Sequence, residues 1–228
     1  MTRFLVALAV QTALVSALIL GPAWALNGSF AWPRGWLGVS SFFAAAALGG
    51  LWISRIDADL ARERAAIPRP QTIADRLAPL LIAVSILAWF GVAAWDAHRL
   101  QLLPLPPAVS LCTGLATFAA GVAIVAWTLR TNSFAALVVK IQGERRQRVV
   151  DTGPYAWVRH PMYLGAMVFF AGLGLILGSL AAGLAAPLLI GLAFLPRIGI
   201  EEETLRRDLA GYADYQSRVR ARLVPGIF

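Results

Sequence analysis

Residues 153–165 read GPYAWVRHPMYLG, and they place arginine, histidine, proline and tyrosine where the chain enters a hydrophobic run. A second polar group, the consecutive glutamates Glu201, Glu202 and Glu203, follows the end of the next hydrophobic run. Charged groups beside hydrocarbon are costly unless they are paired or functional. The two segments therefore indicate that function is concentrated at one edge of a membrane-embedded fold.

The rest of the chain is strongly apolar. Of its 228 residues, 59% are hydrophobic and 14% are charged, and the mean hydropathy is +0.70, which excludes an ordinary soluble domain. A helix needs about 20 residues to cross hydrocarbon. Gly178 and Ser179 alone separate the last two runs, so we expect a tight helical hairpin there. The sequence predicts an all-α integral membrane protein with five or six transmembrane helices, from runs at 4–26, 36–54, 77–95, 108–129, 162–177 and 180–196.

The runs divide into a plain part and a part rich in polar motifs. Residues 1–107 are rich in alanine, leucine and glycine, and we interpret them as a transmembrane scaffold. Residues 108–228 contain the polar motifs and are predicted to form the functional core. The first run resembles a signal peptide, but it is long for one, and we expect a retained helix.

Most of the 20 basic residues lie in three places: residues 55–76, residues 130–160, and the tail from Arg197 onward. With six crossings, these three segments lie on one side of the membrane, which the positive-inside rule makes cytoplasmic. We therefore expect a site that faces the cytoplasm. The heavy use of arginine, with Lys140 as the sole lysine, suggests a bacterial inner-membrane protein.

The net charge of +8 does not indicate nucleic-acid binding. The arginines lie beside the spans, where topology and anionic lipid headgroups explain them. With two histidines, one cysteine and no Cys/His spacing typical of metal sites, the sequence favours no metal. Membrane lipids are the partners that the composition itself predicts.

The segment around Arg159 and His160 has a local structure that its residues predict. Gly153-Pro154 is a turn signal, and Pro161 is favoured in the first turn of a helix. Arg159 and His160 therefore flank a helix N-terminus, where backbone N–H groups and the helix dipole favour an anionic ligand. Taken alone, each residue would by default have a structural role: the arginine would extend to the membrane interface, and the histidine would cap the helix.

The segment after the hairpin is predicted to form an amphipathic helix, which either lies on the membrane surface or closes over a pocket. The three glutamates before it either compensate the dipole at its N-terminus or contribute a ligand, and residue types alone leave both open. Its apolar positions recur at helical spacing, at Leu205, Leu209, Tyr212, Val219 and Leu223.

A longer motif connects the two polar segments. It reads V-x-x-G-P-Y-x-x-V-R-H-P-x-Y-x-G and, after the hydrophobic hairpin, R-x-x-x-E-E-x-x-L and Y-x-x-Y-x-x-x-V. The matching residues are Val150, Gly153, Pro154, Tyr155, Val158, Arg159, His160, Pro161, Tyr163, Gly165, Arg197, Glu201, Glu202, Leu205, Tyr212, Tyr215 and Val219. Over roughly residues 126 to 226, the chain thereby resembles the isoprenylcysteine carboxyl methyltransferase family. Membrane phospholipid methyltransferases share much of this pattern, and sterol C14 reductases are similar in their C-terminal half but use a nicotinamide cofactor.

The resemblance implies a methyltransferase that uses S-adenosylmethionine, with a cytoplasmic cofactor site built from the loop before the hairpin and the segment after it. His160 and Tyr163 would line the cofactor cleft. Glu201 or Glu202 would bind the methionine ammonium, and Glu202 aligns best. The residues expected at the cofactor are Gln142, Val150, Gly153, Tyr155, His160, Tyr163, Glu201 and Glu202.

The resemblance also implies a lipophilic acceptor that enters from the bilayer. Arg159 and Glu202 are the residues expected to be catalytic, since a guanidinium can orient an acceptor carboxylate through two parallel hydrogen bonds. One departure bears on a prenylcysteine substrate: this chain has Asp208-Leu209 where those family members usually have F-G. The alternatives are a phospholipid N-methyltransferase, an NADPH-dependent sterol-type reductase and a non-enzymatic membrane protein.

Overall fold

The chain folds as a bundle of helices. The computed structural model describes residues 2–65, 73–136 and 141–226, and every regular element within these ranges is helical. The prediction of an all-helical membrane fold is confirmed. The long helices are α1 (Thr2–Asn27), α2 (Pro33–Ile56), α4 (Ile73–Trp95), α5 (Pro107–Thr131), α6 (Pro161–Leu177) and α7 (Leu180–Asp208). The short elements are α3 (Ala58–Ala65), the π-helical η1 (Asp96–Leu100), the 3-10 turns η2 (Gly143–Arg145) and η3 (Gly153–Ala156), and α8 (Tyr212–Arg218).

Helix length and surface chemistry fit a bilayer. In the described part of the chain, five helices are long and apolar enough to cross a membrane. The outward face of α4 suits lipid rather than water, because Leu80, Val84 and Leu87 are 58%, 53% and 57% exposed. At 1.5 Å per residue, α6 is about 25 Å long, slightly shorter than the hydrocarbon core.

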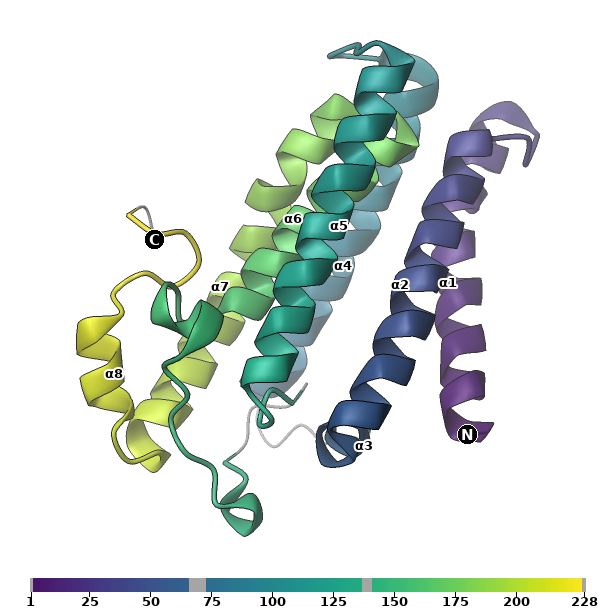
Figure 1. Ribbon diagram of the computed structural model, residues 1–228. Helices are drawn as coiled ribbons and strands as arrows, with labels where there is room; N and C mark the ends of the chain where they lie inside the picture. The colour runs from purple at the N-terminus through teal and green to yellow at the C-terminus, as the bar shows by residue number, and fades with distance from the viewer. Residues whose placement is uncertain (1, 66–72, 137–140, 227–228) are drawn as a thin grey trace.

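Helices α4 to α7 lie side by side, and α1 and α2 form a pair beside them (Figure 1). Helix α6 packs against both α5 and α7, and α4 packs against α7. The fully buried Trp89 of α4 joins three of these helices. Its ring meets that of Phe170 on α6 edge to face at 5.1 Å, and its indole N–H donates to the Ala182 carbonyl of α7 at 2.9 Å.

Small residues let α5 and α6 approach backbone to backbone. A Cβ atom at Gly172 of α6 would lie 2.2 Å from the Phe118 nitrogen of α5, and one at Gly121 of α5 would lie 2.4 Å from the Phe169 nitrogen. Close approach of this kind is how membrane helices gain packing energy without a hydrophobic driving force. The contact fixes the two helices whose ends carry the polar motif.

The expected hairpin is present between α6 and α7. Gly178 adopts a φ of +94°, which ends α6, and Ser179 caps α7 by accepting a hydrogen bond from the Ala182 nitrogen at 2.9 Å. The Ser179 hydroxyl also donates to Asp96 Oδ2 at 2.5 Å. Both side chains are buried, so the turn is anchored to the end of α4 through η1.

The expectation for the segment after residue 196 is wrong. Helix α7 does not end there but continues to Asp208, past Pro196 and through all three glutamates. No single amphipathic helix follows: the chain turns at Gly211, whose φ is +82°, and α8 ends at Arg218. Glu201 and its neighbours therefore lie in the C-terminal turns of a helix, where the dipole disfavours negative charge. Dipole compensation does not explain them.

Candidate functional site

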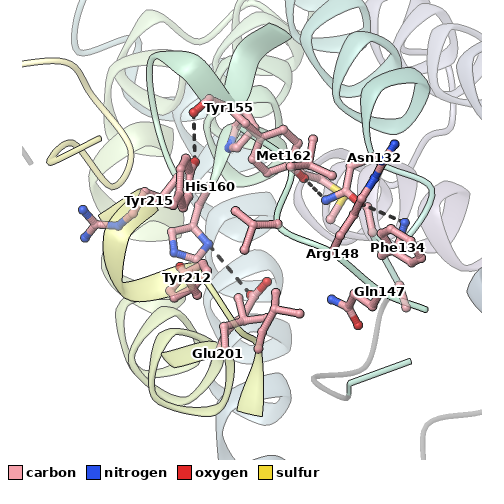
Figure 2. A pocket seen from close by; sticks show the side chains of 18 of the residues that line it. Asn132, Phe134, Gln147, Arg148, Tyr155, His160, Met162, Glu201, Tyr212 and Tyr215 are labelled. Atoms are coloured by element: carbon pink, nitrogen blue, oxygen red, sulfur yellow. Dashed lines mark hydrogen bonds and ion pairs between the residues drawn. The ribbon is translucent and has the colours of Figure 1, made fainter. Parts of the chain in front are cut away.

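A pocket lies at the arginine-rich end of the bundle. Figure 2 shows side chains from several segments gathered around it. The lining residues come from segments 132–136, 147–150, 155–163 and 201–215, so the ends of α5, α6 and α7 and the start of α8 all contribute. The cavity volume is about 90 Å³, which is room for several water molecules and more than a packing defect.

Glu201 is the carboxylate that faces this pocket. The Tyr163 hydroxyl donates to its Oε2 at 2.9 Å and accepts from Arg197 Nε at 2.9 Å. His160 Nδ1 lies 3.9 Å from the same oxygen, and its ring stacks on that of Tyr163 at 5.6 Å. The Glu201 side chain is 30% exposed. Since its other oxygen has no partner among the described residues, the carboxylate is held in orientation with one acceptor free for a ligand.

Glu202 faces the opposite way, into a buried network. Its Oε1 accepts from Arg159 Nε at 2.6 Å and lies 3.1 Å from His160 Nε2. Its Oε2 accepts from Arg222 Nε at 3.1 Å and from Gln216 Nε2 at 3.4 Å. With both oxygens engaged and 5% of its surface exposed, Glu202 does not line the pocket. Successive helix positions point about 100° apart, which explains the different surroundings of the two glutamates.

Arg159 ties the C-terminal tail to the start of α6. Its Nη1 donates to the carbonyls of Val219 and Arg220, each at 2.7 Å, and its backbone nitrogen donates to the Ala221 carbonyl at 3.0 Å. Leu223, just beyond, is buried in the core. Of the guanidinium nitrogens, Nη2 alone has no partner among the described residues, so Arg159 has no pair of parallel donors left for a carboxylate.

The structure brings most of the expected residues to the pocket. Six of them line it: Val150, Tyr155, Arg159, His160, Tyr163 and Glu201. Gly153, Gln142 and Glu202 do not. Gly153, with a φ of +58°, packs against Thr131, where a Cβ would come within 2.8 Å of the hydroxyl. Gln142 is buried, and its Nε2 donates to the Phe134 carbonyl at 2.9 Å, so it shapes a lining segment.

The sequence left open whether the tail lies on the membrane surface or closes over a pocket. In the structure it packs against the pocket. Tyr212 and Tyr215 of α8 are buried and line it. The Tyr215 hydroxyl donates to the Tyr155 carbonyl at 2.9 Å, which fastens α8 to η3. Burial raises the pKa of the Tyr155 phenol, and burial together with the nearby Glu202 and Glu201 raises that of Tyr212. Both phenols are therefore neutral at physiological pH.

Asn132 and Arg148 are among the lining residues that were not singled out from the sequence. Asn132, at the end of α5, donates from Nδ2 to the Tyr155 hydroxyl at 2.9 Å. Arg148 lines the pocket as an exposed cation (Figure 2). The only sequence signal for either was its place in the polar segment between two hydrophobic runs. Within the described ranges, no group of three or more His, Cys, Asp or Glu residues could hold a metal ion.

Known proteins support the resemblance. Residues 109–210 match the model of a family described as phospholipid methyltransferase. A curated relative, the nickel-cobalt-cadmium resistance protein NccN of Alcaligenes xylosoxydans xylosoxydans, is 32% identical over 81 residues. That match covers 36% of this chain and 38% of the relative's length, so it describes only part of either protein. The family match contains α6, α7 and most of the pocket, and it fits a membrane methyltransferase.

Proposed function

We propose that the protein is an integral membrane methyltransferase that transfers the methyl group of S-adenosylmethionine to a lipophilic acceptor. The observation that supports this most directly is the pocket itself. It is a cavity lined by both polar and apolar side chains, with a single carboxylate, Glu201, among its described lining residues. It lies largely within the part of the chain that matches a methyltransferase family.

The residues present suit the chemistry of the cofactor. Its methionine part is a zwitterion, and the pocket offers Glu201 for the ammonium and Arg148 for the carboxylate. Its adenosine part is flat and weakly polar, and the neutral rings of Tyr155 and Tyr212 with the side chain of Val150 provide a matching surface. Glu201, rather than the fully engaged Glu202, is the glutamate that we assign to the ammonium.

Each polar group around Glu201 has a definite task in this proposal. Tyr163 fixes one carboxylate oxygen through its hydroxyl, and Arg197 fixes Tyr163 in turn. His160 and Arg159, both held by Glu202, keep the tail closed over the site and exclude water. When bound, S-adenosylmethionine supplies a methyl group on a positively charged sulfur. The chain needs to supply alignment and a dry site, and positioning of this kind contributes up to about 7 to 11 kcal/mol in ideal cases.

The acceptor in this proposal is a lipid or lipidated molecule that enters from the bilayer. The protein lies in a bacterial inner membrane, with its arginine-rich end on the cytoplasmic side. A carboxylate acceptor, as in prenylcysteine O-methylation, is our first candidate because a carboxylate reacts without a strong base. A phospholipid amine is the second, and the description of the matching family favours it.

The test is calorimetric titration of the detergent-purified protein with S-adenosylmethionine, S-adenosylhomocysteine and NADPH in parallel. We expect saturable binding of the first two and none of NADPH. Glu201→Gln should weaken the binding of S-adenosylmethionine about tenfold or more by removing the charge opposite the ammonium. Glu203→Gln, at the exposed neighbour, is the control and should bind as the wild type does. Binding of NADPH alone would instead identify a reductase.

A further inference from the structure

Arg64 is a half-buried cation beside the pocket that the proposed function leaves without a task. It lies on α3, at the same end of the bundle as α8 (Figure 1). Its Nη1 donates to the Ala135 carbonyl at 2.9 Å and contacts Met162 Sδ at 3.4 Å. Ala135 and Met162 both line the pocket. Arg64 therefore lies directly behind a wall of the site, although it comes from the half of the chain that the sequence marks as scaffold.

The charge on Arg64 has no counterion in the part of the chain that the structure describes. Two other arginines near the site that are not fully exposed are compensated: Arg159 pairs with Glu202, and Arg145 lies 3.9 Å from Asp57. Arg64 instead contacts a neutral carbonyl and a thioether. A partly desolvated guanidinium without an anion is costly, and such groups in membrane proteins tend to mark binding sites for substrates or ions.

Electrostatics supports the same interpretation. Burial lowers the pKa of Arg64, so its surroundings disfavour the charged form that it nevertheless keeps, because arginine does not lose its proton in proteins. Tyr155, a third lining residue, also lies near Arg64. An anion that reached the wall formed by Ala135, Met162 and Tyr155 would relieve the unfavourable burial.

Met162 also indicates the direction from which such an anion comes. It occupies the first turn of α6, where the chain passes from the polar segment into the apolar bundle. A ligand that meets this position with its charged end has its apolar end beside hydrocarbon. This geometry suits an amphiphile with an anionic headgroup rather than a wholly water-soluble anion.

We propose that Arg64 binds the anionic headgroup of the lipid acceptor, so that the substrate class is an amphiphile with a carboxylate or phosphate next to its reacting end. That the bound amphiphile is the methyl acceptor rests on the proposed function, whereas the binding of an anion at Arg64 can be tested without it. It moves the task of holding the anion from Arg159, whose donors are largely engaged, to a residue on α3.

The test is equilibrium binding of three probes to the purified protein in a neutral detergent. The probes are N-acetyl-S-farnesylcysteine as the carboxylate, its methyl ester as the neutral analogue, and oleoyl lysophosphatidic acid as the phosphate. We expect the wild type to prefer at least one anionic probe to the ester, and the stronger of the two identifies the headgroup. The preference of the wild type should be about tenfold or more, and Arg64→Gln should abolish it. Arg62→Gln, on the exposed side of the same helix, should keep it.

Two further results test the anion site if Arg64→Gln folds poorly. Arg64→Lys keeps the positive charge and should keep most of the preference. A wild type that binds the ester as tightly as both anions, or an Arg64→Gln variant that keeps the full preference, overturns the proposal. Titration of the same samples with S-adenosylmethionine separates the two hypotheses. An Arg64-dependent preference without cofactor binding refutes the proposed function alone, and cofactor binding without that preference refutes the anion site alone.

Discussion

Two adjacent glutamates have different surroundings, and this difference decides how the site is interpreted. Glu201 points into the pocket and is oriented by Tyr163, whereas Glu202 is buried among Arg159, His160 and Arg222. Residue types and spacing could predict this cluster as part of a candidate site. They could not predict which glutamate faces the ligand, because that depends on the rotation of α7 in the bundle.

The buried network predicts a large effect on stability at Glu202. Glu202→Ala leaves the buried Arg159 without its carboxylate, and we expect a loss of about 3 to 5 kcal/mol in unfolding free energy. Thermal unfolding in detergent measures it. Glu203→Ala, on the exposed face, should leave the unfolding temperature nearly unchanged. An equally small change at Glu202 would show that the network contributes little.

At the scale of the helices, the hydropathy of the sequence predicted the spans well and the helix ends less well. The run 108–129 corresponds to α5, Pro107–Thr131, but the run 180–196 corresponds to only the first part of α7. Hydropathy reports where a helix meets lipid, and α7 continues beyond that point with polar residues that favour helix. Because of this extension, Glu201 can reach the pocket.

The contact between α5 and α6 predicts a second effect on stability. Gly172→Ala places a methyl group against the Phe118 backbone, and separating the two helices should cost about 1 to 3 kcal/mol. Gly91→Ala on α4 is the matched control, because a Cβ there meets nothing within 4 Å. Unfolding of both variants in the same detergent compares them. Equal stability would show that α5 and α6 can separate slightly without loss.

At the scale of the whole molecule, the site is assembled from segments that are far apart in the sequence. Asn132 follows α5 and His160 precedes α6, whereas Tyr155 lies in η3, Glu201 in the last turns of α7 and Tyr215 in α8. They meet because the end of α5, the start of α6 and the end of α7 lie near one another. The sequence predicted the polar motif and the hairpin that bring them together. It could not predict the contribution of α3, since Arg64 meets a residue 98 positions away through a contact that no local pattern encodes.

The division at residue 107 remains a prediction, but the contacts of α3 and α4 show that the first half does more than add spans. Trp89 is packed inside the α6–α7 core, and Arg64 supports the pocket wall. We therefore expect the region from residue 108 onward to depend on the first half for a complete site.

The most direct measurement of the central claim is methyl transfer itself. Membranes that contain the protein are incubated with S-adenosylmethionine labelled in its methyl group, and label is counted in the organic extract. We predict label in extracted lipid with the wild type and with Glu203→Gln, and its loss with Glu201→Gln. Extracted label no higher than in membranes without the protein, or equal label with Glu201→Gln, would contradict the account.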